Sequence, residues 1–204
     1  MKKKLDNGRE KPIALHSETK EASAPLSMDE SPWYAVRLFT LRLQAACEYF
    51  KQYNLETYIP MQYVDFEDRH GQRKRELRPV VRNLVFVKKT VTPAQMSTLV
   101  QESPLKMAVV RKNHDSREYC EIPPQEMREF QLMCNPEIEM RKYLSGSEAR
   151  LKAGTQVKVV FGPLKGLSGK LVRQSHKYYL LKEVPGMAVM LKISRWCCKP
   201  VEKI

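Results

Sequence analysis

The side chains best suited to chemistry in this 204-residue chain are cations grouped around a glycine-rich turn near its C-terminus. The turn and its flanks contain Gly162, Lys165, Gly166, Gly169, Lys170, Arg173 and Lys177. Glycine supplies the backbone freedom that a tight turn needs, and ammonium and guanidinium groups bind phosphates and carboxylates. We therefore predict a partner-binding turn that contacts RNA or an acidic face of a protein. A basic surface that serves only solubility is the alternative.

Cysteines and histidines are the second set of residues with chemical potential, because both types bind metals. The chain contains Cys47, Cys120, Cys134, Cys197, Cys198, His16, His70, His114 and His176. No two cysteines have the Cys-x-x-Cys spacing of a zinc site, and the adjacent pair would point to opposite faces of a strand. We expect buried, inert thiols and neither a metal nor a cofactor. The sequence shows no paired nucleophile and base and no phosphate-binding loop, so we expect no enzymatic activity.

The charge of the chain favours a polyanionic partner over a small neutral substrate. Thirty-six Lys and Arg residues against 23 Asp and Glu residues give a net charge of +13. Residues 151–204 carry eleven basic and two acidic side chains, and residues 31–110 carry twelve basic and seven acidic ones. The longest apolar run spans five residues, 187–191, far below the roughly 20 that a membrane span needs. No apolar signal segment follows the basic N-terminus, so we expect a cytoplasmic protein.

Composition divides the chain into four segments. Residues 1–31 lack an apolar period and are predicted to form a disordered tail. Residues 32–135 are predicted to form one domain and residues 151–204 a second one. Residues 136–150 contain Asn-Pro and Ser-Gly-Ser steps with few large apolar groups, so we expect a flexible linker, with a short helix near 137–144 as an option.

Hydrophobic patterns predict an α+β fold for the first domain, with helices on a mainly antiparallel sheet. The expected strands are 33–36, 56–66, 73–78, 80–87 and 106–110, and the expected helices begin at Thr40, Thr92 and Pro123. The helix after Thr40 is expected to end near Asn54, and the segment 68–71 is expected to form a hairpin turn.

Short strands and glycine turns predict a small β-barrel for the second domain. The expected strands are 154–161, a segment around Leu171, 178–182 and 187–193. Gly and Pro between them disfavour a helical fold, and about 50 residues are enough for a strongly bent barrel. The chain thus combines a larger α+β sandwich with a small β-barrel.

The sequence resembles the NusG/RfaH superfamily over residues 32–204. The C-terminal part resembles the KOW motif in Gly154-x-x-Val157-x-Val159-x-x-Gly162-Pro163-x-Lys165-Gly166-x-x-Gly169. The N-terminal part resembles the NusG N-terminal (NGN) domain in Trp33-Tyr34-x-Val36, Tyr58-Ile59-Pro60 and Arg78-Pro79…Leu84-Val85-Phe86-Val87. Within the superfamily, these sequence motifs are most similar to those of the UpxY-like antiterminators of capsular polysaccharide operons.

The resemblance implies a transcription elongation and antitermination factor that suppresses pausing and termination. The NGN domain of the family docks on the clamp helices of RNA polymerase, and that surface maps onto Val81, Leu84 and Phe86. The resemblance also implies a monomer, with a ribosomal protein or Rho as possible partners of the KOW domain. The alternatives are that both faces of the 80–87 strand are core, and that the chain is a ribosome-associated or RNA-binding KOW protein without polymerase contact.

Two further surfaces are candidates for contact with non-template DNA, upstream DNA or nascent RNA. The outer face of the first helix would present Arg42, Tyr49 and Gln52 to phosphate, base face and base edge. The basic hairpin would place its cations along DNA: Arg69, Arg73, Lys74, Arg75 and Arg78. The alternative for the helix is an ordinary solvated face. The alternative for the hairpin is a charged strand edge that prevents aggregation.

Overall fold

The computed structural model of the chain describes residues 30–201 apart from residues 114 and 139. The tail expected over 1–31 lies almost wholly outside the described residues. The strands up to the third helix are β1 (Trp33–Leu38), β2 (Thr57–Tyr58), β3 (Met61–Glu67), β4 (Arg73–Pro79), β5 (Leu84–Lys88), β6 (Met107–Val109) and β7 (Glu121–Ile122). The helices are α1 (Leu43–Gln52), α2 (Pro93–Glu102), α3 (Pro124–Met133), α4 (Gly146–Arg150) and a 3-10 turn, η1 (Arg195–Cys197).

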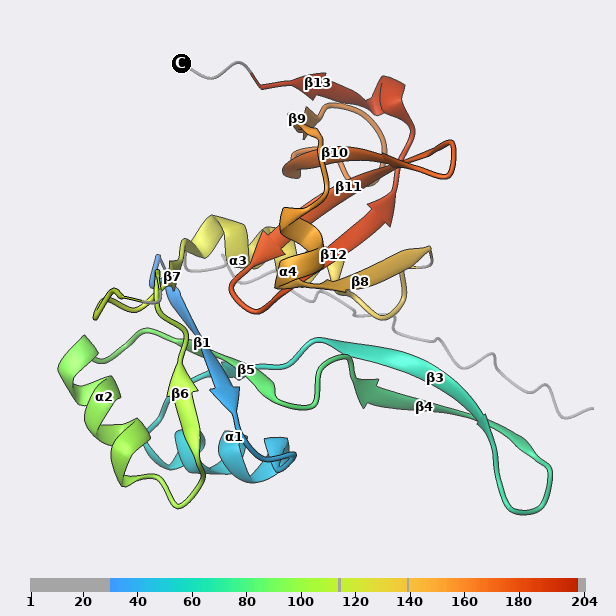
Figure 1. Cartoon of the computed structure of the whole chain (residues 1–204). Coiled ribbons are helices and arrows are strands. Elements are labelled where there is room, and N and C mark those ends of the chain that lie inside the picture. Colours follow the sequence, from blue (N-terminus) through green and yellow to red (C-terminus); the bar gives the residue numbers. More distant parts are fainter. Residues whose placement is uncertain (1–29, 114, 139, 202–204) are drawn as a thin grey trace, which may run out of the picture.

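The N-terminal module, residues 33–122, is built around an antiparallel sheet with β1 near its centre (Figure 1). The strand order is β2-β5-β1-β6, and β7 pairs with the start of β1. β1 and β5 are apolar on both faces, as expected of strands covered on both sides. Helices α1 and α2 lie together on one face of this sheet (Figure 1). The α+β architecture predicted for this part of the chain is confirmed.

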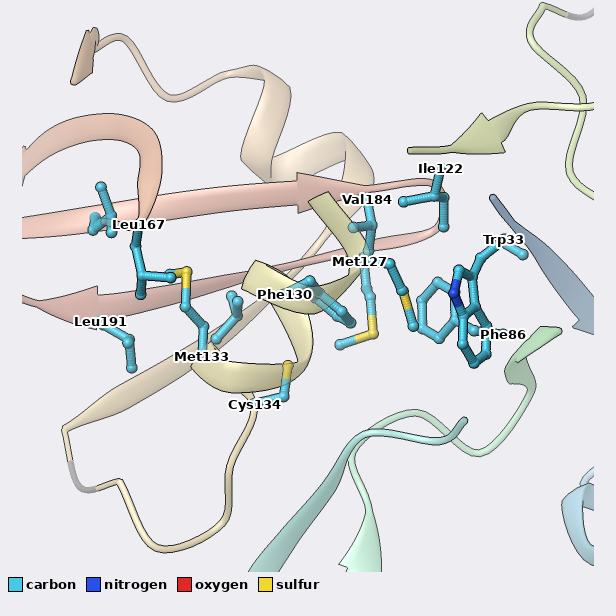
Figure 2. Close-up of a cluster of buried hydrophobic side chains, with 14 of the residues drawn as sticks. Trp33, Phe86, Ile122, Met127, Phe130, Met133, Cys134, Leu167, Val184 and Leu191 are labelled. Carbon is cyan, nitrogen blue, oxygen red and sulfur yellow. The ribbon is translucent and has the colours of Figure 1, made fainter. Parts of the chain in front are cut away.

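The second face of the N-terminal sheet is covered by α3 and, beyond it, by a second sheet. Trp33, Leu84 and Phe86 belong to one buried cluster with Phe130 of α3. Figure 2 shows the rings of Trp33 and Phe86 beside α3. The same cluster continues into the second sheet through residues such as Val184. The two sheets therefore share one hydrophobic core, with α3 between them.

The basic segment forms a two-stranded hairpin, β3–β4, that projects away from the sheet (Figure 1). The strand expected over 56–66 is interrupted, because Pro60 has no N–H for a ladder and separates β2 from β3. The turn predicted over 68–71 is confirmed. Asp68 Oδ1 accepts the backbone N–H groups of His70 and Gln72, at 2.8 and 3.0 Å, and Gly71 has a φ of +74°.

The C-terminal module, residues 141–200, is a six-stranded antiparallel sheet. Its strands are β8 (Arg141–Ser145), β9 (Thr155–Val159), β10 (Ser168–Gln174), β11 (Lys177–Val184), β12 (Met187–Lys192) and β13 (Cys198–Pro200). Their order is β13-β9-β10-β11-β12-β8. The predicted β character is confirmed, but no ladder joins the outer strands β13 and β8 in the described part of the chain. The sheet is therefore open, and the expected closed barrel is not found.

The segment expected to be a flexible linker, 136–150, has regular structure over its second half. β8 pairs along its whole length with β12, and α4 follows it directly. A helix near 137–144 is therefore also wrong. The physical reason is tertiary, because the apolar strand β12 needs a neighbour on its outer edge and β8 supplies it.

The helix starts are confirmed in part. α2 begins after Thr92, whose side chain accepts the backbone N–H of Gln95 in a capping box. α1 begins at Leu43 with Arg42 at its N-cap, so Thr40 does not cap it. Asn54 adopts a left-handed conformation, φ 56°, just after α1 ends, as a terminating residue does. No helix among the described residues is long and apolar enough to cross a membrane.

Candidate functional site

The first candidate surface is the face of β5 that carries Leu84 and Phe86. Their exposed fractions are only 2% and 0%. The ring of Phe86 meets that of Phe130 edge-to-face, with centroids 5.4 Å apart. Leu84 packs on Gly186 so closely that a Cβ there would lie 3.0 Å from the leucine methyls. In this structure both faces of β5 are core, which is the alternative weighed from the sequence.

Val81 lies at the margin of the same contact. It is half-buried against the shared core and lines a crevice of about 370 Å³ between the two modules. The crevice is closed from the other side by Tyr143 of β8 and Met187 of β12. The three residues expected to meet a partner therefore meet the C-terminal module and α3 instead, and an intermolecular contact through them requires the modules to separate.

A buried ion pair fastens α3 to the C-terminal sheet. Glu129 and Lys182 are 6% and 8% exposed, and Lys182 Nζ lies 2.9 Å from Glu129 Oε2. The hydroxyl of Ser168 donates to the same carboxylate at 2.8 Å. Burial alone would raise the pKa of Glu129, but the hydrogen bonds from Lys182 and Ser168 outweigh it and hold this pKa below its ordinary value. The site therefore stabilises the charged form of Glu129.

An apolar groove remains open beside the buried face, between the base of the hairpin and α3. Its volume is about 600 Å³, and Tyr58, Leu77 and Leu132 are among its lining residues. Leu132 is 59% exposed, and Tyr58 contacts Phe86 across ring centroids 6.3 Å apart. The groove is thus an exposed extension of the shared core. The groove could not be predicted from the sequence, because its lining comes from the segments 58–61, 77 and 128–136, which are distant along the chain.

The trio expected on the outer face of α1 is divided by the structure. Arg42 and Gln52 are exposed. Tyr49 turns toward α2, where its hydroxyl donates to the backbone oxygen of Leu99 at 2.7 Å. Burial raises the pKa of Tyr49 to about 12. Tyr49 is therefore bound to α2 within the N-terminal module, and of the three side chains only Arg42 and Gln52 are exposed.

The hairpin keeps some of its cations engaged internally. Lys74 Nζ lies 2.7 Å from Asp68 Oδ2, and the Arg75 guanidinium stacks 4.4 Å from the centre of the Tyr63 ring. Arg78 pairs with Glu76 at 2.8 Å, whereas Arg73 is exposed on the strand. All of these groups reach solvent. The hairpin therefore has a cationic surface on which Asp68 and Glu76 partly neutralise the charges of Lys74 and Arg78.

The glycine turn has the geometry predicted for it. Gly162 and Gly166 adopt φ values of +88° and +97°, which favour glycine. Gly169 lies where a Cβ would approach the backbone oxygen of Leu181 to 2.6 Å, so its role is close strand contact. Lys165 is exposed on the turn.

The two cations that follow this turn have different surroundings. Lys170 is bonded inward to Glu183 at 3.0 Å, while Arg173 is exposed. Lys177 is exposed as well. Lys165, Arg173 and Lys177 of the expected set are therefore available to a partner.

The cysteines have the character expected of inert thiols. Cys134 and Cys197 are buried, and the other three are half-buried. Burial raises the pKa of Cys134 to about 12, and burial also raises the pKa of Cys47, Cys120 and Cys198. Thiolate is scarce at these four positions at neutral pH.

Comparison with known proteins gives a partial match. Residues 31–131 match the protein-family model described as transcription termination factor nusG. These residues form the N-terminal sheet with α1, α2, the hairpin and most of α3. No curated protein matches the chain. The family match supports membership of this chain in the NusG superfamily.

Proposed function

We propose that this chain is a transcription elongation and antitermination factor that binds RNA polymerase and suppresses pausing and termination. The match of residues 31–131 to transcription termination factor nusG carries the proposal. NusG proteins are non-enzymatic, so we assign this chain no enzymatic activity, and we place it in the cytoplasm as a monomer. The likeness of its motifs to UpxY-like proteins supports a role in a capsular polysaccharide operon.

The proposed polymerase contact uses Val81, Leu84 and Phe86 on the clamp helices. Because this face is covered by α3 and the C-terminal sheet, the proposal includes a step in which the modules separate. The open groove at Leu77 and Leu132 supports an initial contact, since exposed apolar side chains beside a buried apolar face form a continuous docking surface once the cover moves.

The remaining contacts are proposed from charge. Arg42 and Gln52 on α1, with the hairpin cations Arg73, Lys74 and Arg75, are placed near DNA held by the polymerase. The C-terminal module is proposed to be a KOW domain that recruits a ribosomal protein or Rho. Its glycine turn, with the positive φ values at Gly162 and Gly166 described above, supports that assignment.

The test is a pull-down of core RNA polymerase with the full chain and two matched variants. Leu132→Glu places a charge in the open groove, whereas Leu151→Glu places one just after the end of α4, where Leu151 is 86% exposed. We expect the wild type and Leu151→Glu to bind and Leu132→Glu to bind at least tenfold more weakly. A wild-type chain that ignores polymerase and binds ribosomal subunits would instead support the ribosome-associated alternative.

The operon specialisation is tested separately. Polymerase occupancy is mapped along polysaccharide operons with and without the chain, and a first-gene position in such an operon is the matching genomic observation. We expect occupancy to extend further downstream in these operons when the chain is present. Equal extension in all operons would contradict the specialisation and leave the general function intact.

A further inference from the structure

An open groove crosses the C-terminal module. It lies between β9, β10, β11 and the segment that follows β12, and its volume is about 1180 Å³. Its polar and aromatic lining residues are Thr155, Arg173, His176, Lys177, Tyr178, Lys192, Ser194, Arg195 and Trp196. We call this surface the C-terminal groove. It shares Arg173 and Lys177 with the cations that flank the glycine turn, and it is separate from the polymerase-binding face proposed above.

The C-terminal groove is lined by cations and by no carboxylate. Arg173, Lys177, Lys192 and Arg195 are all exposed. None of the ion pairs in the described part of the chain involves any of these four side chains, so their charges are directed to solvent. Four unpaired cations around one concave surface attract a ligand with several negative charges rather than a single anion.

An exposed aromatic pair lies at one end of the groove. Trp196 is 69% exposed and Phe161 is 60% exposed, and their ring centroids are 5.1 Å apart at an interplanar angle of 46°. The ring of Tyr178 adds a third aromatic surface, with the Arg173 guanidinium 5.9 Å from its centre. Tryptophan is highly buried on average, and flat rings next to cations form a stacking platform for unpaired bases.

The turn between β10 and β11 forms one rim of the groove. Ser175 and His176 have φ values of 48° and 60°, and Gln174 pairs with Lys177 across them. The connection is therefore a two-residue hairpin turn of the kind that antiparallel strands favour. It places Lys177, the first residue of β11, among the residues that line the groove.

We propose that the C-terminal groove binds single-stranded RNA, with bases stacked on Trp196 and phosphates on Arg173, Lys177 and Arg195. A duplex hides its base faces, so it cannot use an aromatic platform. Thr155, His176 and Ser194 add hydrogen-bonding groups suited to a ribose 2′-hydroxyl. The proposal rests on the proposed function only for the source of the RNA, which is the transcript leaving the polymerase.

The test measures binding of the full chain to a fluorescently labelled 12-nucleotide RNA by anisotropy, without polymerase. Trp196→Ala is expected to weaken binding about tenfold, since one stacked base contributes on this order. Lys177→Gln is expected to lower the slope of log affinity against log salt by about 0.7, the value for one phosphate of a single strand. Lys158→Gln, an exposed cation of β9 outside the groove, is the matched control and should change the affinity least.

The outcomes separate the groove from general electrostatics and from the polymerase contact. Unchanged affinity in Trp196→Ala, or equal losses in Lys158→Gln and Lys177→Gln, would overturn the groove as the site. Equal or tighter binding of DNA of the same sequence, or of duplex RNA, would overturn the assignment to single-stranded RNA. The anisotropy measurement contains no polymerase. A negative pull-down therefore does not affect the conclusion about RNA binding, and a negative anisotropy result does not affect the conclusion about polymerase binding.

Discussion

The β5 face and the C-terminal groove both present aromatic side chains, yet Phe86 is fully buried and Trp196 is 69% exposed. The neighbours of the two side chains explain the difference. Phe86 is surrounded by apolar groups of α3 and the second sheet, so burial removes its surface from water at no electrostatic cost. Trp196 lies among cations that must stay hydrated. The ring of Phe86 is therefore enclosed in the core, whereas the cations around Trp196 keep that surface open to water.

The largest test of this contrast is Phe86→Ala. We expect a loss of about 3–5 kcal/mol in the free energy of unfolding, because the change removes a fully buried ring. Phe161→Ala, at a 60% exposed ring, should change it by about 0.5 kcal/mol or less. Urea denaturation measures both. Equal stability of Phe86→Ala and the wild type would show that the β5 face is not covered in solution, and would restore it as a freely accessible docking surface.

The second test concerns the ion pair that joins α3 to the C-terminal sheet. Lys182→Met should cost about 3 kcal/mol, because it leaves the Glu129 carboxylate buried without its counter-charge. The double variant Glu129→Leu/Lys182→Met should recover most of that loss, since an apolar pair of similar volume is often neutral at such sites. Thermal or urea unfolding provides the measurement. If the single and double variants are equally unstable, the charge pairing does not explain the effect.

Most helices and strands could be predicted from the sequence, but which of them pack against one another could not. The alternation at β5 shows that Leu84 and Phe86 share a face, but nothing local says which distant element packs on it. β8 was missed for the same reason: Arg141, Lys142 and Ser145 have no strand pattern, and only the ladder with β12 makes the segment extended. Trp196 could not be assigned because a single aromatic residue has no period, and its neighbours in the groove come from four separate segments.

The third test is the pH dependence of the module contact. The pKa of Glu129 in the folded chain lies below its ordinary value of 4.5. Its contribution to stability is therefore fully present above that value and is lost as the pH falls through the lower folded pKa. We expect Glu129→Gln to be less stable than wild type at pH 7, and this gap to narrow as the pH falls below 4.5 and through the lower folded pKa. A gap that stays constant between these pH values would contradict the ion-pair account.

The smallest test compares two helix caps on either side of the shared core. Thr92 caps α2, on the sheet face away from the second module, and Ser145 caps α4 in the C-terminal module, each within a capping box. Thr92→Ala and Ser145→Ala should each cost about 1 kcal/mol, or roughly 2–4 °C in the melting temperature of a chain of this size.

The pattern of these two shifts tells whether the core that buries Phe86 makes the modules one cooperative unit. If it does, either change moves a single transition, seen alike by far-ultraviolet circular dichroism and by tryptophan fluorescence. Two transitions, with Thr92→Ala moving only one of them and Ser145→Ala only the other, would mean that each module unfolds alone. Separation of the modules would then be inexpensive, and the β5 face would be accessible to a partner at little free-energy cost.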